Sequence, residues 1–425
     1  MTGIRSMAKP SVSQVDPGKI PEPFPVELKN GLPVFLFDSG TEEIERIEFT
    51  FDAGNIRESV PLLASTVNLM LQEGTEKYRS VRLNRLLDMY CAFFQPYTDS
   101  DRAGIIICFM NKYAGKALEL AREMLFFPLF NEKELKLLTK KRFQQYFIER
   151  EKVHRLASDE FFESIFGKNH PYGRTTVPDD FANIRLSDLA EFHSAFYKPE
   201  NMAIIVSGKI NEKLIDLLNE YFGGFSLKYA NACKSALSPK GEENRIRHIS
   251  KPGSVQCAIR IGSSTINKRH PDYPGLKIVN MILGGYFGSR LMNNLREEKG
   301  YTYGISSSVI SLKMAGYKSI SAEVSKLFTQ KAIDEIYMEI RQLQNEPIGK
   351  EELETVRNYM MGELVRMFDG PFTIPESFRS VWEFGLDNSY FYRLASKIKS
   401  IDPDEITELA RTYYNIDDLY QITAG

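Results

Sequence analysis

Short apolar runs along the chain predict strands, and apolar residues spaced three to four positions apart predict helices between them. Residues 47–51 alternate apolar and polar side chains, which is the period of a half-buried strand. Residues 61–73 place their apolar side chains on one helical face, and Gly74 is a stop signal. The other predicted strands are 32–37, 105–109 and 202–206, and the other predicted helices are 83–90, 115–124, 132–156 and 187–196. Adjacent strands in irregular alternation with helices favour an α+β fold over a doubly wound parallel sheet.

An internal repeat relates the two halves of the chain. Residues 188–208, DLAEFHSAFYKPENMAIIVSG, align without a gap with residues 405–425, EITELARTYYNIDDLYQITAG, at an offset of 217 residues. Both segments predict a helix, an aromatic turn, a strand and a final glycine. A period of this length indicates a duplicated domain rather than a solenoid. The predicted organisation is an extended arm over 1–24, a first domain over 25–227, a linker over 228–245 and a second domain over 246–425.

Composition and charge exclude several classes of function. Of the 425 residues, 43% are hydrophobic and 26% are charged, and the net charge of −2 argues against nucleic acid or an anionic membrane as a partner. The basic run at 140–142 is expected to be a solvated helix face. No run approaches the roughly 18 apolar residues of a membrane helix, and the N-terminal segment lacks an apolar signal core. We therefore expect no membrane span and a cytoplasmic location, unless an export signal was removed.

The four cysteines show no paired spacing, and those inside apolar runs are expected to be reduced core thiols. They are Cys91, Cys108, Cys233 and Cys257. The five histidines are scattered and have no partner at ligand spacing. They are His154, His170, His193, His248 and His270. We expect no metal site in this chain.

The stretch 281–307, MILGGYFGSRLMNNLREEKGYTYGISS, predicts a glycine-rich turn, a short amphipathic helix, a break at Gly300 and an aromatic strand. Arg296 and Tyr303 are seven residues apart across that break, so both could reach one point near the start of the strand. Arginine offers a rigid fork of donors and tyrosine a hydroxyl, a pair suited to binding a peptide carbonyl or its oxyanion. On spacing alone, such a pair at a helix end is more often structural.

The stretch resembles the second half of the pitrilysin/insulinase-type zinc peptidases, a family that includes the mitochondrial processing peptidase and small two-chain bacterial members. The resemblance rests on G-G-x-x-x-S-R-L followed by L-R-E-x-x-G-x-x-Y-x-x-x-S, and it extends over nearly the whole chain. It implies that Arg296 and Tyr303 bind substrate beside a zinc ion carried on a separate homologous half. It also leads us to interpret the turn as a substrate-binding loop. The loop residues are Gly284, Gly285, Gly288 and Ser289.

The zinc motif of this family, H-x-x-E-H, is missing from the first half. The matching stretch, residues 62–75, reads LLASTVNLMLQEGT and keeps the flanking residues of the family pattern. Ser65, Asn68 and Leu69 stand where the two histidines and the glutamate are expected, and the third ligand falls at Gln145 or Tyr146. A hydroxyl is a poor zinc ligand, an amide cannot act as a base, and leucine cannot ligate at all.

The resemblance implies two tandem homologous metallopeptidase-like α/β-layer domains of α+β class that form half of a clamshell. We expect the non-zinc, substrate-binding subunit of a heteromeric zinc peptidase, inactive alone. Its homologous partner would bear H-x-x-E-H and the zinc, and its substrate would be an extended peptide. Two alternatives remain at this point: a catalytically inactive structural subunit, and a peptide-binding homodimer.

Overall fold

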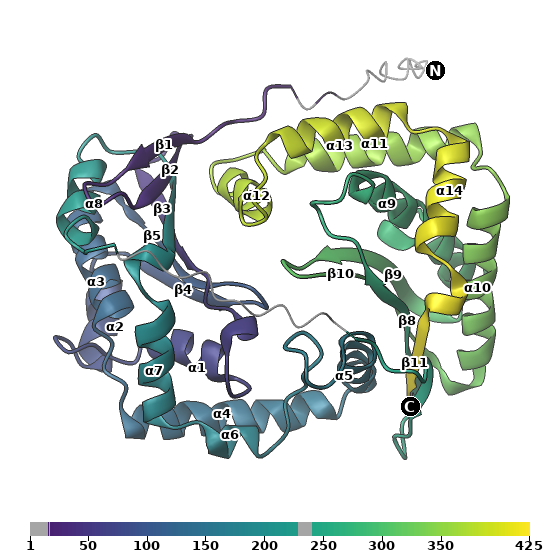
Figure 1. Ribbon diagram of the computed structural model, residues 1–425, viewed down its shortest axis with the longest axis horizontal. Helices are drawn as coiled ribbons and strands as arrows, with labels where there is room; N and C mark the ends of the chain where they lie inside the picture. The colour runs from purple at the N-terminus through teal and green to yellow at the C-terminus, as the bar shows by residue number, and fades with distance from the viewer. Residues whose placement is uncertain (1–15, 17, 228–239) are drawn as a thin grey trace, which may run out of the picture.

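Two β-sheets, one in each half of the chain, organise the computed structural model, which describes residues 16, 18–227 and 240–425 (Figure 1). The first sheet has the strand order β1-β2-β6-β3-β5-β4, and the second has the order β7-β11-β8-β10-β9. The strands of the first sheet are β1 (Phe24–Glu27), β2 (Pro33–Asp38), β3 (Ile44–Phe51), β4 (Phe93–Thr98), β5 (Ala103–Met110) and β6 (Met202–Gly208). Those of the second are β7 (Ile246–Ile249), β8 (Gln256–Thr265), β9 (Thr302–Ser311), β10 (Gly316–Ser325) and β11 (Tyr420–Ala424).

The two sheets repeat one topology. A parallel pair, β2 with β6 or β7 with β11, lies beside antiparallel neighbours in each sheet. The helices before the repeated strands, α7 (Leu186–Phe196) and α14 (Pro403–Tyr413), begin and end 217 residues apart. The predicted α+β fold class of tandem homologous halves is confirmed. The predicted domain limits stay predictions, and most of the expected arm and linker, residues 1–15, 17 and 228–239, lie outside the described residues.

Helices cover the outer faces of the sheets, as Figure 1 shows. The first half contains α1 (Leu63–Met70), α2 (Ser80–Met89), α3 (Ala114–Phe126), α4 (Glu132–Arg150), α5 (Val153–Phe166), α6 (Asp180–Asn183), α7 and α8 (Leu214–Phe222). The second contains α9 (Tyr273–Asn280), α10 (Thr329–Asn345), α11 (Lys350–Arg366), α12 (Thr373–Trp382), α13 (Ser389–Ser400) and α14. Alternate residues Ile47, Phe49 and Phe51 of β3 are fully buried in the first core. The polar residues between them, Glu48 and Thr50, are buried as well, so the strand is covered on both faces and is not half-buried. No helix in the described part of the chain is both long and apolar enough to span a bilayer.

Several sequence predictions are wrong in detail. The helix predicted over 132–156 is interrupted after Arg150, and a second helix, α5, begins at Val153. The break allows α5 to pack against the sheet of the second half of the chain. The glycine turn and the following helix are both π-helical, over Met281–Gly285 and Met292–Glu298. Cys108 is half-exposed rather than a core thiol. Strand β4 was not predicted.

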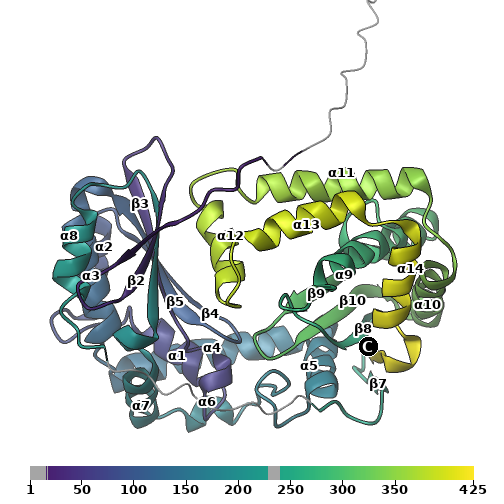
Figure 2. The same cartoon turned by 45° about the horizontal axis from the view of Figure 1, so that its top comes forward.

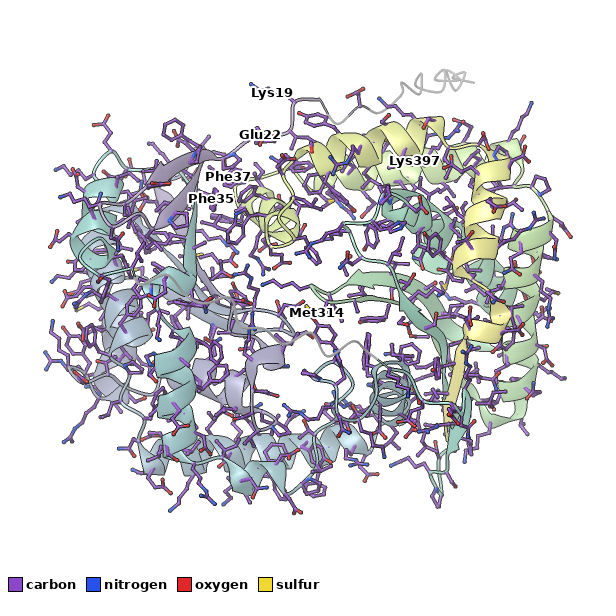
Figure 3. The ribbon with its side chains drawn as sticks, in the orientation of Figure 1. Lys19, Glu22, Phe35, Phe37, Met314 and Lys397 are labelled. Atoms are coloured by element: carbon purple, nitrogen blue, oxygen red, sulfur yellow. The ribbon has the colours of Figure 1, made fainter. Side chains whose placement is uncertain are left out.

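Each half sends one helix across to the sheet of the other (Figure 2). α5 packs Phe161 and Ile165 against Tyr420 and Ile422 of β11. In return, α12 places Phe378 against Phe35 and Phe37 of β2, with ring centroids 4.9 and 5.4 Å away. Figure 3 labels both β2 phenylalanines beside this helix. At the offset of the repeat, α5 and α12 occupy corresponding positions, so the exchange is reciprocal.

Ion pairs reinforce this exchange between the halves. Arg379 of α12 reaches the buried Glu48 carboxylate at 3.0 Å. At the tip of the β9–β10 hairpin, where Figure 3 labels Met314, the Lys313 ammonium lies 2.9 Å from Asp52. The backbone N–H of Lys313 also donates to Asp101 across 2.9 Å. The two halves of the chain therefore form one continuous packed body.

Candidate functional site

Helix α1 holds the three positions of the missing zinc motif, and Asn68 among them is a buried structural amide. Its Nδ2 donates to the backbone carbonyls of Tyr97 and Gly104 at 2.6 and 3.0 Å. Its Oδ1 accepts from the Tyr197 hydroxyl at 2.9 Å. This amide ties α1 to β4, β5 and the end of α7, and a carboxylate could not make the two donations.

A guanidinium from α4 occupies the neighbourhood of the first motif position. Arg142 Nη2 donates to Ser65 Oγ at 2.8 Å, and Nη1 donates to Thr66 Oγ1 at 2.5 Å. Both hydroxyls in turn donate to the carbonyl of Leu62. Burial lowers the pKa of Arg142, and the Glu58 carboxylate opposes that shift. Arg142 therefore joins α4 to α1 at the place where the family resemblance predicts zinc ligands from the same two helices. The prediction that residues 140–142 form a solvated helix face is wrong for Arg142.

The remaining motif positions offer no metal ligands. The Leu69 side chain is 37% exposed. Gln145 points outward and donates to Glu149 at 3.0 Å. Tyr146 is buried, with its hydroxyl donating to the carbonyl of Thr176 at 3.2 Å and accepting from Arg150 at 2.6 Å. Among the described residues, no three His, Cys, Asp or Glu side chains cluster closely enough to hold a metal ion.

The predicted substrate-binding loop combines closely packed glycines with an exposed stretch at Phe287 and Gly288. A Cβ on Gly284 would lie 2.7 Å from the Cβ of Ser307, so glycine is required for this π-helical turn to approach β9. A Cβ on Gly285 would meet the Met281 sulfur at 2.9 Å, and one on Gly288 would meet the Tyr286 ring at 2.8 Å. Ser289 is buried, and its N–H donates to the Tyr286 carbonyl at 3.1 Å. This packing fixes the segment that leads into Arg296.

Arg296 and Tyr303 lie on consecutive elements. Arg296 is half-buried in the π-helical segment before β9, with its guanidinium 4.7 Å from the centre of the Phe287 ring and 3.4 Å from Glu297. Tyr303 is the second residue of β9 and is 93% exposed. Its hydroxyl has no hydrogen-bond partner among the described residues. A large aromatic side chain held in water on an ordered strand is free to contact a ligand.

Tyr303 forms one wall of a cavity of about 380 Å³ over the second sheet. The floor comes from β8, β9 and β10, and the first turn of α5 closes one side. The lining includes His154, Arg260, Thr302, Gly304, Ser321 and Glu323. The His154 ring and the Glu323 carboxylate are 3.1 Å apart, and both also line an adjoining hollow of about 610 Å³. Sequence analysis missed these residues because they come from separate elements without a local motif.

The cavity extends from the inner strands β8 and β10 to β9, which is the outermost strand of the second sheet. An edge strand has backbone N–H and C=O groups that an extended peptide can pair with. Of the two predicted residues, Tyr303 lines this cavity and Arg296 is outside its lining. His154 and Glu323 line the same cavity as Tyr303, and no metal-binding cluster lies among the described residues.

Comparisons with known proteins show which proteins the chain resembles in sequence and in fold. Residues 183–360 match the family model described as the peptidase M16 inactive domain. The chain is 23% identical over 345 residues to an uncharacterized zinc protease, YmxG, of Bacillus subtilis, covering 79% of this chain and 82% of the relative. It is 21% identical over 368 residues to the non-peptidase homolog YmxG of Helicobacter pylori, covering 84% and 83%. The solved peptidase M16 inactive domain from Pseudomonas fluorescens superposes with a TM-score of 0.82 at 20% identity, covering 95% and 98%. The predicted resemblance to the pitrilysin/insulinase-type family is confirmed.

Proposed function

We propose that this chain is the non-zinc, substrate-binding subunit of a heteromeric zinc peptidase. A homologous partner would bear H-x-x-E-H, and Arg296 and Tyr303 would act at the partner's zinc centre. The observation that carries the proposal is the exposure of Tyr303, which is 93% accessible on the free edge of the second sheet beside a cavity. Arg296 supports the same region, because its guanidinium lies 4.7 Å from the centre of the Phe287 ring, just before the π-helical segment that precedes β9.

The contrast between the two halves supports this division of roles. In the first half, Ser65 and Asn68 have been absorbed into hydrogen bonds that hold helices and strands together. In the second half, Tyr303 has no such structural partner in the described residues and is left free in water. Two diverged copies of one fold can divide a site in this way when one supplies the metal and the other supplies donors. The cytoplasmic location and the domain limits stay predictions.

The chemical role of the pair would be electrostatic. The partner's zinc ion would supply Lewis-acid chemistry at a bound carbonyl, and the negative charge that develops on the carbonyl oxygen would need donors already in place. The Arg296 guanidinium and the Tyr303 hydroxyl would stabilise that charge or hold a neighbouring backbone carbonyl. Because the two groups would act on one oxyanion, their loss should not be additive.

The test is turnover of an internally quenched peptide by the complex with the zinc-bearing homologue, after sizing confirms assembly. Tyr303→Phe removes only a hydroxyl, and we expect a loss of roughly 10²–10³ in rate. Tyr301→Phe is the matched control, because the Tyr301 ring is half-buried and stacks on Phe328 at 4.9 Å. Arg296→Ala should also be slow, and the double variant should cost less than the product of the single losses.

A wild-type rate from the Tyr303→Phe complex would contradict the proposal. The chain would then serve as a structural subunit. A chain that forms stable homodimers and binds peptide without the zinc-bearing homologue would instead favour the peptide-binding homodimer.

A further inference from the structure

We infer that Arg260 forms a carboxylate-binding subsite, so that this chain selects peptides carrying a free C-terminal carboxylate or an acidic side chain. The inference rests on the proposed function and adds to it the chemical class of the substrate. Arg260 would be a specificity contact on the floor of the cavity whose wall includes Tyr303. Its strand, β8, lies outside the segment that contains Arg296 and Tyr303.

Arg260 is a half-buried cation without an acidic partner. It lies on the inner strand β8, and its Nη1 donates to Ser319 Oγ at 3.1 Å. Half-buried arginines of this chain pair with either kind of group: Arg290 binds Glu352 at 2.7 Å, whereas Arg142 donates to the hydroxyls of Ser65 and Thr66. No ion pair among the described residues includes Arg260. Arg260 lines the cavity that Tyr303 walls, and a further neighbour is the Tyr317 side chain.

The floor around Arg260 is built from small hydroxyl side chains. Strand register sets Arg260 opposite Ser321, and Ser321 opposite Ser306, so the three side chains share one face of the sheet. The next row on that face pairs Ser319 with Ser308. Serines leave open space above the sheet where larger residues would fill it. Their hydroxyls can also accept from a bound peptide or donate to it.

The ligand chemistry follows from the guanidinium and its surroundings. A planar guanidinium binds a carboxylate through two parallel N–H···O bonds, and a half-buried cation gains most from a counter-ion. The cavity also contains the Glu323 carboxylate, which faces His154. That negative charge would repel a dianion such as phosphate more strongly than a monoanionic carboxylate. The free edge of β9 alongside favours a peptide as the molecule that carries the carboxylate.

The test compares four fluorescein-labelled Thr/Val peptides by anisotropy with the wild-type full chain at low salt. One ends in a free carboxylate, and one is its C-terminal amide. The other two are amides that carry a single internal Glu or Gln. We expect the carboxylate peptide of at least one pair to bind on the order of tenfold more tightly, because charge-assisted bonds exceed neutral ones. The pair that discriminates identifies the source of the carboxylate.

Arg260→Gln should abolish this preference while melting at the wild-type temperature, because the amide can still donate to Ser319. Arg393→Gln is the matched control, since Arg393 also donates to a serine hydroxyl, Ser389 at 2.7 Å, but is exposed on α13. Equal binding within both pairs by the wild-type chain, absence of binding by all four peptides, or a preference that survives in Arg260→Gln would overturn the inference. Loss of turnover in Tyr303→Phe together with equal peptide binding would leave the proposed function intact and reject only the role of Arg260.

Discussion

Arg142 Nη2 lies 2.8 Å from Ser65 Oγ and joins α4 to α1 at the first position of the missing zinc motif. A metal ion draws helices together through ligands from each of them, and here a guanidinium makes the connection through hydroxyls. The site has therefore become part of the scaffold, and restoring the ligand residues would mean removing contacts that now stabilise the fold.

Arg142→Met should lower the free energy of unfolding by about 1–3 kcal/mol, because two hydrogen bonds from a charged group are lost while the side-chain volume is kept. Lys141→Met is the control, since Lys141 is exposed on the same helix and its replacement should change stability by less than about 0.5 kcal/mol. Urea unfolding followed by circular dichroism measures both variants. Equal stabilities would show that the link between α1 and α4 contributes nothing.

The triple variant Ser65→His, Asn68→Glu, Leu69→His should bind no stoichiometric zinc and show no peptidase activity. The Asn68→Glu step should cost about 3–5 kcal/mol, because it places a carboxylate against the carbonyls of Tyr97 and Gly104. Leu69→His alone should be nearly neutral, since that side chain is partly exposed. Metal analysis after dialysis against trace zinc, with the wild-type chain alongside, is the measurement. One tightly held zinc per chain in either protein would refute this account.

Glu45 should make the protein less stable as pH rises from about 4.5 to about 7. Desolvation raises the pKa of this buried carboxyl to about 7, and the hydrogen bond from the Asn211 N–H only partly opposes it. The folded chain thus holds the proton more tightly than the unfolded chain, whose pKa is near 4.5. The stability present below pH 4.5 is lost through this window, to the extent of about 3 kcal/mol.

Glu45→Gln stays neutral and should show a flatter profile over the same range. Chemical unfolding of both proteins at matched ionic strength from pH 4.5 to 8 gives the comparison. Parallel profiles would mean that Glu45 is not the group responsible. Glu43→Gln serves as the control, because Glu43 is exposed on the approach to the same strand.

Phe378→Ala should destabilise both halves together by about 3–5 kcal/mol, as expected for truncating a buried aromatic residue. Trp382, the only tryptophan of the chain, lies on the same helix with its ring 5.3 Å from that of Phe35. Its fluorescence therefore reports directly on this contact between the halves. Phe93→Ala, which truncates an exposed ring on β4, should have a much smaller effect. A fluorescence transition separate from that of circular dichroism would show that the halves unfold independently.

The duplicated α+β fold was predictable from strand and helix patterns and from the internal repeat, and the loss of the zinc motif from the family resemblance. Alternation fixed β3, and the 217-residue repeat matched α7 with α14 at both ends. The break after Arg150 carries no Gly or Pro, so only the packing of α5 on the second sheet explains it. The two π-helical turns could not be predicted, because the periodicity used for the sequence is that of an α-helix, with 3.6 residues per turn. Arg142 was wrongly placed on a solvated face, because only tertiary structure turns it toward α1.

The residues around Arg260 could not be predicted, because their proximity depends on strand register. Arg260, Ser321 and Ser306 are distant in sequence and meet only when β8, β10 and β9 pair. The roles of Arg296, Tyr303 and the glycine segment were implied by resemblance, and they stay predictions until the mixed complex is assayed.

The reciprocal exchange of α5 and α12 determines where a substrate could enter the proposed complex. Pulling the two halves of this chain apart would strip each sheet of a helix and separate Arg379 from Glu48 and Lys313 from Asp52. Such an internal hinge would have to break many contacts at once. We therefore expect the gate to be the seam between this chain and its partner. The rate of peptide entry should then depend on how readily two separate proteins part, and a cross-link placed across that seam should trap the chamber closed.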